Sequence, residues 1–156
     1  MTAITPLAAM HGTLESMAEK FTDALPPQID AAKFISVAKT TLTMNPSLLN
    51  ADKTSLLATF MKAAQDGLLL DGKEAAAVKY GNSIQYLPML EGVLKTLHNS
   101  GLIKTISAEV VYEKDLFDYE LGSTPKITHK PLITGDRGKP ICVYSVATTT
   151  NGGEYY

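Results

Sequence analysis

Residues 63–101 decide the fold of this chain, and they read AAQDGLLLDGKEAAAVKYGNSIQYLPMLEGVLKTLHNSG. Gly67 follows an apolar stripe at helical spacing that consists of Leu56, Leu57, Phe60, Met61 and Ala64. Glycine often ends helices because it adopts the left-handed conformation without a Cβ penalty. We therefore expect a helix to end at Gly67.

A β-hairpin and a second helix are expected next. Residues 75–80 and 84–88 have strand length and flank Gly81-Asn82-Ser83, three residues that tolerate positive φ. Pro88 has no N–H to lose at a first helical position, and apolar residues recur at helical spacing after it until Ser100-Gly101. This helix is expected to pack back on the hairpin.

The string from Gly67 to Lys73 satisfies the G-x-x-x-x-G-K part of a nucleotide-binding P-loop. A P-loop continues with Ser or Thr, follows a strand and opens a helix. Here Glu74 follows the lysine, a helix is expected before the string and a strand after it. We interpret the string as a buried turn and expect no ATP requirement.

Residues 1–27 are expected to form an amphipathic N-terminal arm that ends at Pro26-Pro27. Its apolar residues at helical spacing are Leu14, Met17, Ala18, Phe21 and Leu25. Such an arm either covers the core of its own chain or reaches a neighbouring copy, and both alternatives stay open here. Residues 28–156 are expected to form the core domain.

Further helix boundaries are expected between the arm and Gly67. Asp30 is a plausible cap for a helix through about Thr41, and Asn45-Pro46 breaks that helix. Either Asp52 or Thr54 then caps the helix that ends at Gly67.

After Gly101 the hydrophobic period changes to two, as in a strand with one buried face. The alternating apolar residues of that face are Ile106, Ala108, Val110 and Tyr112. A polar turn at 113–115 leads to a partner strand with Phe117, Tyr119 and Leu121, and two more strands are expected at 126–130 and 140–149. The fold class is therefore α+β, with N-terminal helices, a β-hairpin, a central helix and an antiparallel sheet.

Composition limits the class of protein. The net charge of the 156 residues is −2, but residues 31–104 carry eight Lys and Arg against five Asp and Glu. No apolar run approaches the roughly 20 residues of a membrane helix, and no signal sequence is evident, so we expect a cytoplasmic protein. The single Cys142 lies in an apolar strand, where we expect a small core residue.

Catalytic and metal sites are not indicated. Five acids, namely Glu109, Glu113, Asp115, Asp118 and Glu120, could hold a hard cation, but alternating acids are typical of the solvated face of a hairpin, which we favour. The residues His11, His98 and His129 are scattered without zinc-ligand spacing. No nucleophile and base group together in the sequence, so we do not expect an enzyme.

Residues along about two thirds of the chain carry a resemblance to a known family. They include Gln65-Asp66-Gly67-Leu68, Asp71-Gly72, Tyr80-Gly81, Gln85-Tyr86, Pro88, Gly92, Ser100-Gly101, residues 107–113 and His129-Lys130-Pro131. In these positions the chain resembles the RecT family of phage and prophage single-strand annealing proteins. The resemblance implies single-stranded DNA binding, assembly into rings or filaments, and annealing of complementary strands without ATP.

The resemblance also suggests where DNA binds, because the hairpin and the following helix would line the groove. Single-stranded DNA needs cations for its phosphates and flat side chains for its bases. The residues expected to contact it are Lys73, Lys79, Tyr80, Asn82, Gln85, Tyr86, Lys95, Lys104, Lys130 and Arg137. The chain departs from many relatives at Leu90-Glu91 and His98-Asn99, which weakens the expectation of phosphate contacts from that helix.

Partners and alternatives follow from the same resemblance. The implied partners are single-stranded DNA, the annealed duplex intermediate, further copies of the chain, a phage exonuclease and a host single-strand-binding protein in a bacterial cytoplasm. No cofactor is implied, and no motif supports a magnesium site. The chain ends earlier than typical members, so we expect the C-terminal part of the family domain to be missing. The alternative function is a structural or inhibitory fragment that self-assembles without productive DNA binding.

Overall fold

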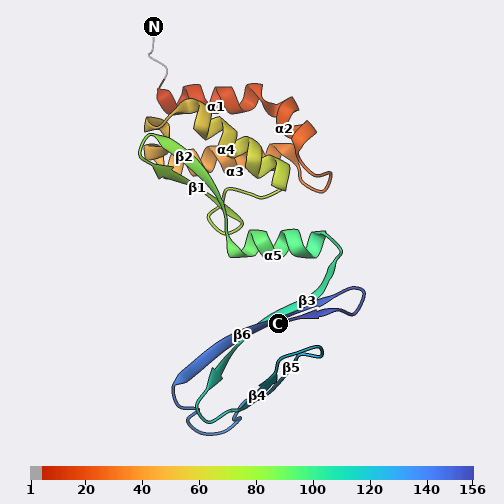
Figure 1. Cartoon of the computed structure of the whole chain (residues 1–156). Coiled ribbons are helices and arrows are strands. Elements are labelled where there is room, and N and C mark those ends of the chain that lie inside the picture. Colours follow the sequence, from red (N-terminus) through yellow and green to blue (C-terminus); the bar gives the residue numbers. More distant parts are fainter. Residues whose placement is uncertain (1–4) are drawn as a thin grey trace. The chain divides into compact units, whose positions relative to one another are not determined.

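The computed structural model describes residues 5–156, which divide into two compact units with the boundary between Thr96 and Leu97 (Figure 1). Five helices, a short 3-10 helix and seven strands follow one another, and all strand pairs are antiparallel. The predicted α+β class is confirmed. The elements up to the boundary are α1 (Pro6–Ser16), α2 (Ala18–Ala24), α3 (Ala31–Met44), η1 (Pro46–Asn50), α4 (Lys53–Asp66), β1 (Ala75–Tyr80), β2 (Ser83–Pro88) and α5 (Leu90–Asn99), which runs across it.

The helix boundaries of the first unit follow from local chemistry. The Asp30 carboxylate accepts a hydrogen bond from the Ala32 N–H (2.8 Å) and begins α3, which runs on to Met44 before Asn45 and Pro46 end it. Asp52, rather than Thr54, caps α4 by accepting from the Ser55 N–H (2.7 Å). Gly67 ends α4 at φ 64°, as its lack of a Cβ allows.

The described part of the N-terminal arm packs on the core of the first unit. Leu14 and Phe21 are fully buried, and Met17 and Ala18 are partly buried against the same core. Phe21 stacks at a tilt on Phe34 of α3, with ring centroids 5.3 Å apart. This segment therefore covers the core of its own chain. The division of the chain into an arm at 1–27 and a core domain at 28–156 stays a prediction.

The predicted hairpin is present, with its second strand beginning one residue earlier than expected. Ser83 belongs to β2, so only Gly81 and Asn82 form the turn. Pro88 does not open α5, as we expected, but ends β2 opposite Ala75. The terminal strand position tolerates a missing N–H, and the chain turns into α5 one residue later, where the Met89 N–H donates to the Glu74 carbonyl (2.9 Å).

The second unit, Leu97–Tyr156, contains two separate antiparallel sheets. Its strands are β3 (Ile103–Tyr112), β4 (Leu116–Glu120), β5 (Lys126–Lys130), β6 (Pro140–Thr149) and β7 (Glu154–Tyr155). β5 and β6 have the predicted bounds. The predicted pairing of the 106–113 strand with the strand that contains Phe117 is wrong, because β3 pairs with β6 and β4 pairs with β5 (Figure 1).

Burial in the second unit also differs from the prediction. Among the hydrophobic residues of this unit, all of which the structure describes, Val111 alone is buried, whereas Val110 is 36% exposed. A register shift in the β3–β6 pairing follows Val111, so strict alternation does not hold there. Cys142 is exposed on β6 and is not the core residue that we expected, because the adjacent part of this strand is also uncovered, with Val143 69% exposed.

Candidate nucleic-acid interface

The pairing register sorts the predicted DNA-contacting residues of the hairpin onto two faces. Directly paired residues of an antiparallel ladder share a face, and neighbours along a strand alternate. Lys79 pairs with Ile84, which is buried against the helices, whereas Tyr80 pairs with Ser83 on the opposite, outward face. Gln85 lies on that outward face as well, and Tyr80 is 55% exposed there.

The hairpin tip is exposed and anchored at one point. The Asn82 carbonyl accepts a hydrogen bond from the Asp52 N–H (2.7 Å), which ties the turn to the start of α4. Gly81 has φ 57°, and a Cβ added to it would meet no atom within 4 Å. The tip is therefore narrow and open, but its position on the helices is held.

Tyr86 lies on the helix-facing side of the hairpin. Its ring is partly buried and packs against the core of the first unit. Burial raises the pKa of its hydroxyl above the ordinary value, and the neighbouring Asp66 carboxylate adds to the rise. The Tyr86 ring is thus less available for base stacking than the Tyr80 ring.

The lysines around the hairpin differ in their surroundings. Lys73 and Lys79 are exposed, and the loop that carries Lys73 is shaped by Asp71, whose carboxylate accepts from the backbone N–H groups of Lys73 (2.8 Å) and Glu74 (2.9 Å). Lys95 instead forms an ion pair with Glu74 (2.7 Å) and donates to the Gly67 carbonyl (3.1 Å). Its charge is already balanced inside the first unit.

The P-loop-like string has the context of a structural turn. It connects the end of α4 to β1, and its Leu68 and Leu70 are each only 2% exposed. The Glu74 carboxylate points back into the turn and accepts from the Leu69 N–H (2.9 Å). The interpretation as a turn between helix and hairpin is confirmed, but only its first part is buried, because Asp71, Gly72 and Lys73 are exposed.

The remaining predicted contacts belong to the second unit. Lys104 on β3 and Lys130 on β5 are exposed. Arg137 lies in the loop between β5 and β6, where both Nε and Nη2 donate to the Asp115 carboxylate and the guanidinium stacks 4.2 Å over the Tyr112 ring. Arg137 therefore has a structural role, and a DNA contact from it stays a prediction.

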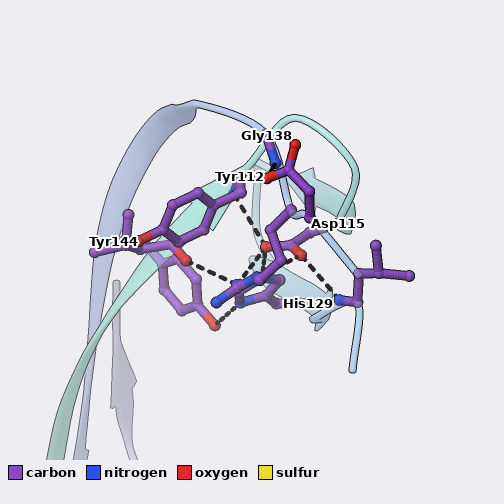
Figure 2. Close-up of polar contacts among 9 residues, drawn as sticks. Tyr112, Asp115, His129, Gly138 and Tyr144 are labelled. Atoms are coloured by element: carbon purple, nitrogen blue, oxygen red, sulfur yellow. Dashed lines mark hydrogen bonds and ion pairs between the residues drawn. The ribbon is translucent and has the colours of Figure 1, made fainter. Parts of the chain in front are cut away.

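Asp115 is the centre of a buried polar cluster that the sequence did not reveal (Figure 2). Its side chain is 0% exposed, so our interpretation of this acid as part of a solvated face is wrong. Besides Arg137, it accepts from the N–H groups of Leu132 (2.9 Å) and Tyr112 (3.0 Å) and contacts His129 Nε2 (3.1 Å). The Arg137 guanidinium, followed by these backbone donors, holds the pKa of Asp115 well below its usual range against the opposing effect of burial.

His129 links this cluster to an aromatic group. Its Nδ1 lies 3.1 Å from the Tyr144 hydroxyl (Figure 2). Its ring also meets Phe117 edge-on at a centroid distance of 5.8 Å. The His129 side chain is only 4% exposed, so a substrate has little access to it. The arrangement fixes the β3–β4 turn, β5 and the 131–139 loop together, and it is suited to structure rather than to acid–base catalysis.

Within residues 5–156, no group of three or more His, Cys, Asp or Glu side chains is placed to hold a metal ion. In the same range, no helix has both the length and the apolar character needed to cross a bilayer.

Two comparisons relate the chain to known proteins. A model described as "RecT family" matches residues 32–156. The chain is 30% identical over 152 residues to Protein RecT of Escherichia coli (strain K12), an alignment that covers 90% of this chain and 56% of that protein. The chain thus spans little more than half the length of this curated relative.

Proposed function

The chain belongs to the RecT family, and on this premise we propose that it acts in phage-type homologous recombination by binding single-stranded DNA and annealing complementary strands without ATP. The DNA strands would remain uncut. The chain spans 56% of the length of Protein RecT. The proposal therefore depends on surface features of this chain as well as on its family membership.

One observation supports the proposal most directly, namely the exposed aromatic on the outward face of the hairpin. Tyr80 is 55% exposed, and Gln85 lies diagonally across the strand pair from it. Stacking of a base on an aromatic ring contributes about 1–3 kcal/mol and does not depend on which base is present. An annealing protein needs such a contact because it must leave the Watson–Crick edges free for the second strand.

Phosphate binding is assigned to exposed lysines. Lys73 precedes the hairpin and Lys79 lies on its strand β1 in the first unit, and Lys104 and Lys130 offer cations in the second. Cations that neutralise phosphates give affinity for any sequence and a strong dependence on salt. The same salt dependence separates DNA binding from apolar association.

The anchored tip at Gly81 and Asn82 is proposed to open the spacing between neighbouring bases. Unstacking costs a few kcal/mol for each step, which phosphate contacts and contacts between adjacent copies must offset. Binding should therefore be cooperative along the strand and should involve a homo-oligomer. A phage exonuclease and a host single-strand-binding protein in the bacterial cytoplasm are the further partners that this function implies.

Annealing of donor- and acceptor-labelled complementary strands, without nucleotide, tests the proposal. Wild-type chain should accelerate pairing, and Tyr80→Ala should reduce that rate while leaving the thermal unfolding midpoint unchanged. Tyr119→Ala is the matched control, because Tyr119 is also a strand tyrosine and is 59% exposed, but in the second unit. Annealing that requires ATP, or equal losses in the two variants, would contradict the proposal.

A second candidate function is supported by the apolar surface of the second unit. Leu121, Ile133 and Val143 are 83%, 96% and 69% exposed. Exposed apolar side chains favour self-association, as expected of a structural or inhibitory assembly. Sedimentation in rising salt distinguishes the two functions, since apolar assembly persists at salt concentrations that release DNA.

A further inference from the structure

The hairpin of β1 and β2 needs support from outside, because it is a sheet of only two strands. A two-stranded hairpin alone is at best marginally stable in water. Its base is held at Ala75, whose N–H donates to the Leu69 carbonyl (3.1 Å) and whose carbonyl accepts from the Gly72 N–H (3.0 Å). The tip lies at the other end, beside Tyr80, and whatever holds it decides how firmly that ring is presented.

The start of α4 holds the tip through Asp52 and Ser55. The Asp52 N–H donates to the Asn82 carbonyl (2.7 Å). The Ser55 hydroxyl accepts from the Ile84 N–H (2.9 Å) and donates to the Asp52 carbonyl (2.8 Å). The Asp52 carboxylate in turn accepts from the Ser55 N–H (2.7 Å). One serine hydroxyl therefore joins β2 to the same residue that holds the turn.

Thr59 continues this contact one helical turn further along α4. Its hydroxyl donates to the Ile84 carbonyl (3.3 Å), and its side chain is only 2% exposed. Both backbone groups of Ile84 are thus bonded to α4. Among the described residues, Asp52, Ser55 and Thr59 give the backbone of residues 76–87 its hydrogen bonds outside the hairpin ladder.

The two residues held near the tip lie on either side of the pairing partner of Tyr80. Tyr80 pairs with Ser83, and Ser83 lies between Asn82 and Ile84 along the chain. Tyr80 is half exposed, so its position depends on this pairing rather than on burial of its ring. If the contact at Ile84 is lost, the tip can move away from α4 and take Tyr80 with it.

We propose that Ser55 is a positioning residue for annealing, because its hydroxyl holds the tip and Tyr80 where single-stranded DNA meets them. This inference rests on the proposed function and deepens it. Opening the step between stacked bases costs free energy, and a tip that swings away yields instead of holding the step open. Ser55 carries no charge and needs no contact with DNA for this role. Its loss should therefore slow annealing without weakening phosphate binding.

The experiment follows annealing of donor- and acceptor-labelled complementary strands without nucleotide, over a protein titration that reaches saturation. Ser55→Ala should lower the rate at saturation by about two- to tenfold, the factor that one hydrogen bond makes in an equilibrium. The protein concentration at half-maximal rate and the salt slope of binding should match wild type, because no phosphate contact is removed. Ser55→Thr keeps the hydroxyl and should restore the wild-type rate.

Thr41→Val is the matched control for the loss of a helix hydroxyl. Thr41 of α3 is also half-buried and donates to a carbonyl outside its helix, but that carbonyl belongs to Leu70 in the turn before the hairpin. This variant and Ser55→Ala should both melt below wild type, since each leaves a backbone group without its partner. Well below both melting midpoints, Thr41→Val should anneal at the wild-type rate.

A double-mutant cycle with Tyr80→Ala separates positioning from stability. If Ser55 acts through the tip, Ser55→Ala should slow the wild-type chain much more than it slows the Tyr80→Ala chain. A general loss of stability would slow both chains by the same factor. Thr59→Val replaces a hydroxyl with a methyl group and should show the same non-additivity. It carries the test if Ser55→Ala is unfolded at the assay temperature.

The outcomes for Ser55 and for the proposed function are distinct. Equal annealing rates for Ser55→Ala and Thr41→Val, with Tyr80→Ala slower than both, would overturn the positioning role and leave the proposed function standing. Equal slowing by Ser55→Ala with and without Tyr80 would overturn the positioning role in the same way. If the wild-type chain does not accelerate annealing, both are overturned.

Discussion

Gly92 of α5 lies against the Glu74 carbonyl at the base of the hairpin, so closely that an added Cβ would be 2.0 Å from the carbonyl oxygen. The Leu68 side chain would be only 2.8 Å from the same Cβ. The Glu74 carbonyl also accepts from the Met89 N–H, and its carboxylate pairs with Lys95. Glu74 thus joins the turn, the hairpin and the start of α5 through both its backbone and its side chain.

Gly92→Ala should therefore destabilise the first unit. Overpacking against backbone costs about 1–3 kcal/mol, and occasionally more. Gly12→Ala in α1 is the control, because a Cβ there meets no atom within 4 Å and alanine favours helix by about 1 kcal/mol over glycine. Urea unfolding measures both, and a Gly92→Ala chain as stable as wild type would refute the close contact.

The lysines near the hairpin should separate into two groups. Lys73→Ala and Lys79→Ala should each lower the salt slope of single-stranded DNA binding by about one, because these lysines are exposed. Lys95→Ala should instead lower stability by about 1–2 kcal/mol, since it leaves the Glu74 carboxylate without its cation. Salt titrations and urea unfolding of the same three proteins check this division, and unchanged slopes for Lys73 and Lys79 would contradict it.

Acid should weaken the second unit through Asp115. The pKa of Asp115 is lowered in the folded state, mainly by Arg137, so its contribution to stability is present above the unfolded pKa of about 3.9. As pH falls below that value toward the folded pKa, the contribution is progressively lost. Melting midpoints of wild type between about pH 7 and pH 3 should fall more steeply than those of Asp115→Asn.

Asp115→Asn should also melt at a lower temperature than wild type near neutral pH, because the buried Arg137 and His129 contacts lose their anion. Asp118→Asn, at an exposed acid of β4, is the control and should behave as wild type. Identical pH profiles for wild type and Asp115→Asn would show that the cluster does not stabilise the fold.

The hairpin tip should matter more for annealing than for assembly. Replacing Tyr80-Gly81-Asn82-Ser83 with a bulkier, rigid turn should slow annealing of complementary strands much more than it reduces self-association. The tip is exposed and a Cβ at Gly81 would meet no atom within 4 Å, so a wider turn has room there if it keeps the positive φ of 57° at this position. A wider turn would not enter between stacked bases. Annealing kinetics and sedimentation are the two measurements, and equal losses in both would show that the hairpin is only structural.

Local signals in the sequence predicted local structure well. The helix end at Gly67, the cap at Asp30, the cap at Asp52 as one of two candidates, and the bounds of β5 and β6 each depend on a few adjacent residues. Strand pairing does not, and the β3–β6 ladder joins segments that the sequence separates by β4 and β5. Adjacency along the chain therefore suggested the wrong partner for β3.

The polar cluster around Asp115 could not be predicted from the sequence for the same reason. Asp115, His129 and Arg137 come from a turn, a strand and a loop, and no spacing among them indicates contact. Asp115 also sits among other acids that follow an alternating pattern, which made a solvated position the natural interpretation. One local signal was present, since Asp115 is the last residue of the turn at 113–115 and its carboxylate can accept from the Tyr112 N–H three residues before it.

The exposed position of Cys142 has a practical consequence. It is the only cysteine among the 156 residues, and it is accessible on a β-strand. A maleimide fluorophore or a nitroxide can therefore be attached to the unaltered chain at one known place. In an assembly of identical copies, energy transfer or dipolar spectroscopy between such labels would report the spacing of neighbouring subunits with and without DNA.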